Sequence, residues 1–338
     1  MASEYIAAVD FQSLLRSLPK STQADWRTAA ERLLRGKTID DISVTDVGGA
    51  LDPYATTEGY RSRLLPSPRF GWTIMANPES ATAEVTALAL STGAQGLDLG
   101  RVHVGDLEPA AFASVRFDFL TTCFADFDAA RAVVPQQLRA DSAVWLQGAT
   151  PEALSALAHV GFAPAHIATL LRATTGSHQL PVQAALAQLV DYLSETQKPA
   201  QLLPHIVLRM EVPSDYVQAI VQLTAMRLLW ANVCLSFGAD EPVPPCRIYG
   251  QICPQPEATA EGYLVDAAAR SVAAVSAGVE ALSVEPFAGD PQQLRRSITL
   301  QQVLALEGNF AMHGDAVRGA AFVETAAVEL AEAAWSNL

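Results

Sequence analysis

Basic residues are scarce in this sequence of 338 residues. It holds 22 lysines and arginines against 36 aspartates and glutamates, which gives a formal net charge of −14 at pH 7. Proteins that bind nucleic acids or anionic membrane surfaces carry clusters of lysine and arginine. The composition therefore indicates a protein that binds neither nucleic acid nor membrane.

Long apolar runs and targeting signals are also missing. No stretch approaches the ~18 consecutive apolar residues typical of a transmembrane helix, and the N-terminus lacks the basic and apolar regions of a secretory signal peptide. We therefore expect a cytoplasmic protein. Half of the residues are hydrophobic, which is enough to bury a sizeable core.

Cysteine is rare, and its spacing excludes the usual cysteine sites. The four cysteines are Cys123, Cys234, Cys246 and Cys253, and no two of them form a CxxC pair. Because a disulfide framework or a zinc site requires closer and more regular spacing, we interpret them as reduced, mostly buried thiols and expect no metal site.

Common nucleotide-binding and hydrolytic motifs are absent as well. The sequence has no GxGxxG after a strand, no phosphate-binding P-loop, no GxSxG and no HExxH. Ser177 and His178 are adjacent in the sequence and need no catalytic triad to explain them.

Short apolar runs alternate with helical patterns from residue 66 onward. The strand-like runs are residues 71–75, 96–99, 114–120, 142–146, 167–171, 205–210, 247–252 and 281–285. The helical patterns that follow most of them are residues 81–92, 126–139, 151–159, 182–195, 214–237, 257–277 and 291–308. Parallel strands need such crossovers, and eight of them favour a closed (β/α)8 TIM barrel. A doubly wound open sheet is the alternative.

The first 65 residues read as a separate helical arm, which gives two parts, residues 1–65 and residues 66–338. Ser21 or Thr22 is suited to cap a helix over residues 23–34, and Gly36 is suited to end it.

Several segments resemble the methylmalonyl-CoA mutase family. Residues 216–232 read YVQAIVQLTAMRLLWAN and residues 266–287 read DAAARSVAAVSAGVEALSVEPF, which are similar to the family's F-x-E-x-A-K-L-R-A-A-R-x-L-W-A helix and its G-G-A-D-S-x-T-V-x-P-F segment. GWTI in the first strand resembles PWTIRQ. The resemblance extends to the arm and to nearly everything after residue 180, and it is weakest over residues 100–175. It implies a barrel of the acyl-CoA mutase type, with an arm that wraps around a partner subunit or, alternatively, covers its own barrel.

The resemblance also implies that the cofactor is bound by another chain. In the family, a cobalamin-binding domain supplies the lower cobalt ligand from a D-x-H-x-x-G motif, whereas the last histidine here, His313, lies in MHGDA. The sequence reaches Leu338, where the linker to such a domain begins. We therefore expect this chain to bind no cofactor alone, and expect adenosylcobalamin in a larger catalytic partner chain.

The polar groups of the family's catalytic site are substituted in this sequence. RSRLLPSPRFG, the segment around the start of the first strand, lacks the family's tyrosine, and a gap-free alignment puts the family's histidine at Leu170. Arg172 and His178 remain the two candidate catalytic residues, and neither is assigned as catalytic.

Polar residues near the strand C-termini are candidates by position, because TIM-barrel sites lie on that face. They are Asn77, Asp98, Asp118, Gln147, Arg172, Gln251 and Glu285. The alternative is that they cap helices and bond loops.

Bulky residues are common in the predicted strands. They are Trp72, Ile74, Phe117, Phe119, Trp145, Leu146, Ile206, Leu208 and Tyr249. About half should point inward, which would leave no room for the pantetheine arm that the family threads along the barrel axis.

Three functions follow from these patterns. The first is a non-catalytic barrel subunit of a heterodimeric, adenosylcobalamin-dependent methylmalonyl-CoA mutase, in which the partner chain isomerises succinyl-CoA and methylmalonyl-CoA. The second is the catalytic barrel of a split acyl-CoA mutase with a separate cobalamin subunit. The third is a stand-alone homodimeric binding or interaction protein.

Overall fold

The computed structural model describes residues 22–39, 41, 45–46, 49–50, 70–80, 82–100, 102, 121–124, 128, 130–131, 143–163, 167–172, 181–255 and 258–338. The chain divides into two compact units, residues 1–56 and residues 57–338. The boundary predicted between residues 65 and 66 falls outside the described residues.

The first unit contains the predicted arm helix, α2, over Gln23–Leu33. Thr22 and Asp25 form a capping box, in which the Thr22 hydroxyl accepts from the Asp25 amide at 3.2 Å and Asp25 Oδ2 accepts from the Thr22 amide at 2.9 Å. A short antiparallel pair, β1 (Thr45–Asp46) with β2 (Gly49–Ala50), follows. No residue of α2 is buried. The arm's predicted contact with a partner stays a prediction.

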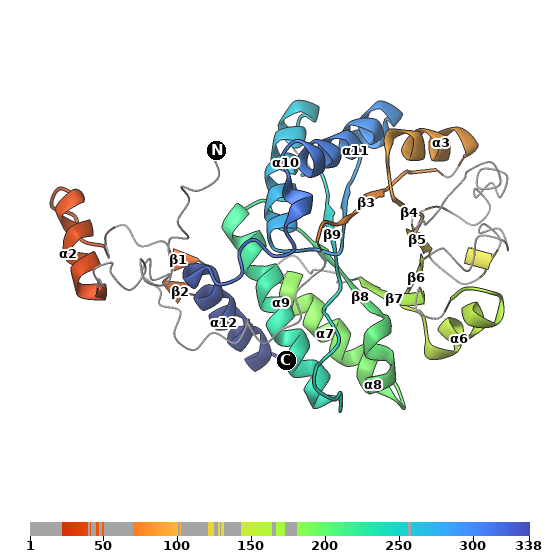
Figure 1. The fold of residues 1–338 in the computed structure, drawn as a ribbon, viewed down its shortest axis with the longest axis horizontal. Helices are drawn as coiled ribbons and strands as arrows, with labels where there is room; N and C mark the ends of the chain where they lie inside the picture. The colour runs from red at the N-terminus through yellow and green to blue at the C-terminus, as the bar shows by residue number, and fades with distance from the viewer. Residues whose placement is uncertain are drawn as a thin grey trace, which may run out of the picture. The chain divides into compact units, whose positions relative to one another are not determined.

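The second unit is a closed barrel of eight parallel strands in the order β10-β3-β4-β5-β6-β7-β8-β9 (Figure 1). The strands are β3 (Thr73–Ala76), β4 (Gly96–Asp98), β5 (Thr121–Phe124), β6 (Ala143–Gln147), β7 (Ile167–Arg172), β8 (Ile206–Glu211), β9 (Ile248–Ile252) and β10 (Ala281–Val284). The TIM barrel predicted from the sequence is confirmed, and the open sheet is wrong.

The third strand lies later than the sequence predicted. The apolar run over residues 114–120 lies outside the described residues, and β5 is formed by TTCF instead. Threonine is β-branched and fits a pleated strand, and Thr122 is fully buried. The prediction failed because it followed hydrophobicity alone.

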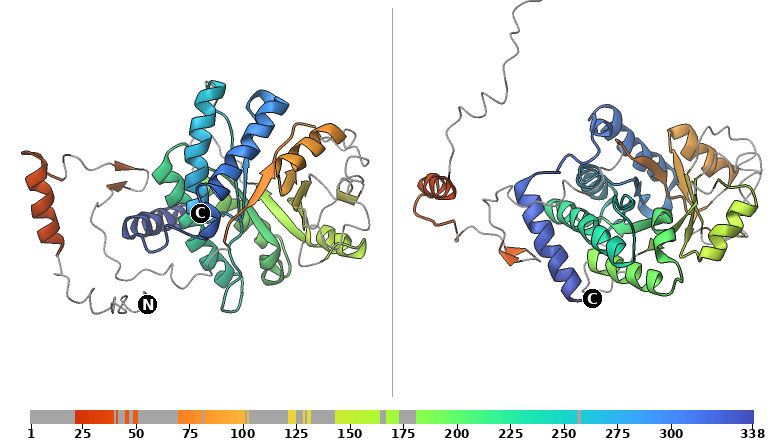
Figure 2. Two further views of the ribbon diagram at one scale, coloured as in Figure 1. Left: turned by 45° about the horizontal axis from the view of Figure 1, so that its top comes forward. Right: turned by 60° about the horizontal axis from the view of Figure 1, so that its bottom comes forward.

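Helices cover the outside of the barrel (Figures 1 and 2). Those that follow strands directly are α3 (Ala83–Thr92), α6 (Pro151–His159), α7 (Pro181–Ser194), α9 (Tyr216–Ser236), α10 (Ala260–Ser276) and α11 (Pro291–Leu306). α8 (Pro199–Leu202) leads toward β8, and α12 (Ala321–Ser336) packs against α9 and α7. Thr82, Thr150, Asp215, Thr259 and Asp290 cap the helices that follow them with side-chain oxygens.

Within the part of the chain that the structure describes, α9 alone is long and apolar enough to cross a membrane, with a mean hydropathy of 1.3 over its most apolar window. However, 72% of that window is buried inside the protein. α9 contacts α7, α10 and α12, and a helix buried on most sides is apolar all round. Its composition is therefore that of a core helix in the barrel wall.

We predict that two leucines of α9 differ sharply in their contribution to stability. Leu223 is 1% exposed and Leu235 is 46% exposed. Leu223→Ala should lower the free energy of unfolding by about 2–5 kcal/mol, since it leaves a cavity, and Leu235→Ala by less than about 1 kcal/mol. Urea denaturation of the two variants measures both values. Equal losses would contradict the packing of α9 described above.

Candidate functional site

The strand register arranges the inward-facing residues of the barrel in layers. In this fold each layer takes its side chains from alternate strands. The two lower layers are Gly96, Trp145, Val207 and Ala281, and above them Met75, Cys123, Leu170 and Tyr249. The third, which we call the polar layer, is Asp98, Gln147, Arg209 and Ser283. The fourth, the mouth layer, contains Asn77, Arg172 and Gln251 at the C-terminal end of the strands.

Aromatic rings fill the lower layers. The rings of Trp145 and Tyr249 lie 5.9 Å apart between centroids and are tilted by 57°. The guanidinium of Arg247 lies 5.5 Å from the centroid of the Trp145 ring. Trp145 is 1% exposed and Tyr249 is fully buried. These two side chains occupy the barrel axis.

An ion pair crosses the axis in the polar layer. Arg209 Nη2 lies 2.9 Å from Asp98 Oδ2, and their strands, β8 and β4, are separated by three strands in either direction around the barrel. The Tyr249 hydroxyl donates to the same carboxylate oxygen at 2.8 Å, and Arg209 Nε donates to Gln251 Oε1 at 2.8 Å. We call Asp98, Arg209, Tyr249 and Trp145 the axial plug.

Burial and charge fix the protonation states of the plug. Burial alone would lower the pKa of Arg209, but the charge of Asp98 together with smaller contributions from Tyr249 raises it overall. Burial, and then the Asp98 carboxylate, raises the pKa of Tyr249 well above its usual value. The same two causes raise the pKa of Cys123. The arginine is therefore charged, the phenol is a donor and the thiol is not a nucleophile.

The chain turns away from the plug at Gly100, directly after β4. Asp98 Oδ1 accepts from the Gly100 amide at 3.1 Å. A Cβ at Gly100 would lie 2.2 Å from Gln147 Nε2 and 3.2 Å from Asp98 Oδ1. A side chain at position 100 would therefore displace the Gln147 amide from its present position.

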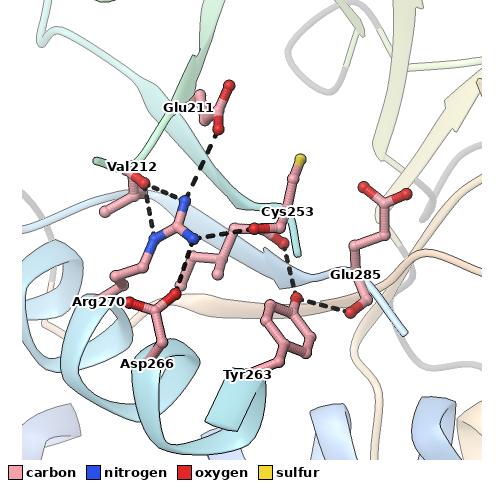
Figure 3. A network of polar contacts seen from close by, with 8 residues as sticks. Glu211, Val212, Cys253, Tyr263, Asp266, Arg270 and Glu285 are labelled. Atoms are coloured by element: carbon pink, nitrogen blue, oxygen red, sulfur yellow. Dashed lines mark hydrogen bonds and ion pairs between the residues drawn. The ribbon is translucent and has the colours of Figure 1, made fainter. Parts of the chain in front are cut away.

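α10 holds the strand ends around the mouth (Figure 3). Arg270 donates to the carbonyls of Val212, at 2.8 Å, and Cys253, at 2.9 Å, and to Asp266 Oδ2 at 3.0 Å. Its Nη2 lies 3.8 Å from Glu211 Oε1. The buried guanidinium thereby ties the segments after β8 and β9 to one helix.

A tyrosine of α10 does the same for β10. The hydroxyl of Tyr263 lies 3.1 Å from the Ile252 carbonyl and 2.7 Å from the Glu285 carbonyl. The Glu285 carboxylate points away from this hydroxyl (Figure 3), so its backbone, and not its charge, is used in the contact.

The structure brings five of the seven predicted mouth residues together in the upper two layers. They are Asn77, Asp98, Gln147, Arg172 and Gln251. Glu285 lies after β10, and Asp118 lies outside the described residues, as does His178. Asp98 and Gln147 are the last residues of β4 and β6, as predicted, and belong to the polar layer directly below the mouth layer.

Sequence reasoning missed Arg209 and the role of Tyr249. Arg209 is a charged residue inside the apolar run IVLRM. It lies two residues after the inward-facing Val207 and therefore faces inward as well, and this position was the signal that the sequence offered. Of the bulky residues predicted to fill the axis, Trp145 and Tyr249 do so. Trp72 instead donates from its indole to Gln301 of α11 at 3.1 Å. Phe117 and Phe119 lie outside the described residues.

The residues that the structure describes include no cluster of three or more histidine, cysteine, aspartate or glutamate side chains suited to a metal. His205 lies before β8, where its Nδ1 is 3.0 Å from the Ile167 carbonyl, and is remote from the mouth layer. A pantetheine arm along the axis would collide with the axial plug.

We predict that Asp98→Asn lowers the free energy of unfolding by about 3–5 kcal/mol, because it leaves the Arg209 charge buried without a counter-charge. Asp98→Asn/Arg209→Met should recover much of the loss, since both charges are then gone. Urea denaturation of the four proteins in a double-mutant cycle measures the coupling. Asp240→Asn, at an exposed position, is the control and should change stability by less than about 0.5 kcal/mol. Additive single effects would show that the two charges do not interact.

A second prediction concerns alkaline pH. The pKa of Tyr249 is raised on folding, so its contribution to stability is complete below the unfolded pKa of about 10 and is lost as the pH rises above it. The stability difference between the natural chain and Tyr249→Phe should therefore be constant below pH 9. Above pH 10 it should shrink by about 1.4 kcal/mol per pH unit. Denaturation from pH 8 to pH 11 measures it, and a difference that stays constant throughout would contradict the burial of this phenol.

Comparisons with known proteins complete the description of the site. A search of curated proteins found no significant match. Similar solved structures include three dihydropteroate synthases. The enzyme from Thermus thermophilus is 16% identical, covers 70% of this chain and 94% of that chain, and has a TM-score of 0.39. The enzyme from Xanthomonas albilineans is 14% identical, with coverages of 71% and 99% and a TM-score of 0.43, and the enzyme from Yersinia pestis is 12% identical, with coverages of 70% and 93% and a TM-score of 0.42. The family model for methylmalonyl-CoA mutase matches residues 167–338, which is half of the chain. The chain therefore belongs to the methylmalonyl-CoA mutase family.

Proposed function

We propose that this chain is the non-catalytic barrel subunit of a heterodimeric, adenosylcobalamin-dependent methylmalonyl-CoA mutase. The observation that carries the proposal is the Asp98–Arg209 ion pair across the barrel axis. On this proposal a larger mutase chain isomerises succinyl-CoA and methylmalonyl-CoA in the cytoplasm, and this chain binds and stabilises it.

The axial plug argues against binding of coenzyme A along the axis. A pantetheine arm would have to separate a buried ion pair, which costs about 3–5 kcal/mol, and would also have to displace the tilted, neighbouring rings of Trp145 and Tyr249. Interactions with a flexible thiol arm would hardly offset both costs. A barrel with this interior is better suited to support a partner than to hold the substrate.

The substitution at Leu170 supports the same proposal. A gap-free alignment with the family places its histidine at this position, and Leu170 lies in the second layer with 1% exposure. Leucine offers no hydrogen bond to a thioester carbonyl. The barrel therefore lacks at this position a group that could polarise the substrate.

The cofactor on this proposal is adenosylcobalamin held by the larger chain, where it would supply radical chemistry. In this chain, the histidines within the described residues are His159, His205 and His313, and none follows the C-terminal end of a strand. The mouth layer thus offers no imidazole to cobalt from these residues.

The proposal is tested by mutase turnover with succinyl-CoA and adenosylcobalamin. This chain alone should show none, and a mixture with the larger mutase chain should be active with one acyl-CoA site per heterodimer, measured by equilibrium dialysis. The stoichiometry follows because only one of the two barrels has an open axis.

His178→Ala in this chain should leave turnover and heterodimer formation unchanged. Two sites per heterodimer, or loss of turnover in His178→Ala with the heterodimer intact, would overturn the proposal in favour of a catalytic barrel. Turnover restored by a separate cobalamin-binding polypeptide without a second barrel would indicate a split mutase. A stable homodimer that binds no larger chain would indicate an interaction module.

A further inference from the structure

Apart from Arg209 Nη2, which is ion-paired with Asp98, four buried nitrogen donors in the polar and mouth layers have no hydrogen-bond partner within the described part of the chain. They are Asn77 Nδ2, Gln147 Nε2, Arg209 Nη1 and Gln251 Nε2. Asn77 is 3% exposed, Arg209 2% and Gln251 4%. Unpaired donors of this kind are unfavourable in a folded protein, and four of them in one place call for a common acceptor.

The donors come from four different strands and meet at two adjacent levels of the axis. Asn77 of β3 and Gln251 of β9 belong to the mouth layer, and Gln147 of β6 and Arg209 of β8 belong to the polar layer directly below. The orientation of the Gln251 amide is fixed, because its Oε1 accepts from Arg209 Nε at 2.8 Å. Its Nε2 is therefore turned away from Arg209.

The charges of the two layers favour an anion. Arg209 and Arg172 carry two positive charges, and Asp98 carries one negative charge. Glu211 and Glu285 stand farther out at the strand ends, where Glu211 lies 3.8 Å from the Arg270 guanidinium. Amide and guanidinium donors together are the groups that hold carboxylates in proteins.

We propose that the mouth of this barrel binds a short-chain carboxylate that is not attached to coenzyme A. Asn77, Gln147, Gln251 and Arg209 donate to its oxygens, and Arg172, which is exposed, stands on the open side. The axial plug is the floor of the site and excludes a ligand with a long tail. The inference goes beyond the proposed function, because a supporting subunit needs no ligand of its own.

Isothermal titration calorimetry on the full chain tests the site, with propionate and succinate as probes and with propionamide as the uncharged control. We expect a carboxylate to bind and propionamide not to bind. Asn77→Leu and Gln251→Met, which remove a donor at similar volume, should each weaken binding at least tenfold. Gln188→Met removes an amide from α7 whose Oε1 is buried, outside the layers, and should leave the affinity unchanged.

Thermal unfolding without ligand gives a second readout. An unpartnered donor replaced by an apolar side chain of the same shape is neutral or stabilising, so Asn77→Leu should not lower the Tm. Three outcomes would overturn the inference: a lower Tm for Asn77→Leu, no binding of either carboxylate, or binding that survives both substitutions. Binding of free coenzyme A would instead contradict the proposed function, so the two failures are distinguishable.

Discussion

The interior of this barrel depends on the ion pair between Asp98 and Arg209. A buried arginine is tolerable only with a counter-charge and further hydrogen bonds, and here Asp98 and Gln251 provide them. The carboxylate in turn is held by the Tyr249 hydroxyl and the Gly100 amide. The pair therefore sets the orientation of the aromatic rings below it and of the amides above it, and through both it determines what the barrel can admit.

The polar network at the strand ends complements the one on the axis. Arg270 and Tyr263 bind mainly backbone carbonyls, namely those of Val212, Cys253, Ile252 and Glu285. The contacts satisfy the carbonyls of Val212, Cys253 and Glu285 beyond the strand ends and give a second donor to the Ile252 carbonyl, which also accepts from the Glu285 amide at 2.9 Å. The segments after β8, β9 and β10 are thereby held to one helix, and the Glu211 carboxylate lies 3.8 Å from the Arg270 guanidinium of that helix.

Much of the fold could be predicted from the sequence, because the strands after residue 140 are short apolar runs between long helical patterns. The third strand could not, since TTCF is less hydrophobic than the run before it, and only pairing with β4 and β6 identifies it. The mouth residues were predictable from their places at strand ends. Their mutual contacts were not: Asp98 and Arg209 lie far apart in the sequence, and their pairing across the axis depends on closure of the barrel. Leu170 and Tyr249 were named in the sequence analysis, but the barrel layer in which each of them lies follows only from the strand register.

The position of the ion pair also bears on how the domain holds together. Asp98 belongs to the half of the barrel outside the family-model match, and Arg209 to the half that the family model matches. Parallel strands pair only with their neighbours, so two half-barrels could in principle open independently along their seams. A charge pair that spans the interior links the halves directly, and opening either seam would expose both charges. The half outside the match should thus unfold cooperatively with the matched half, and open only when the whole barrel does.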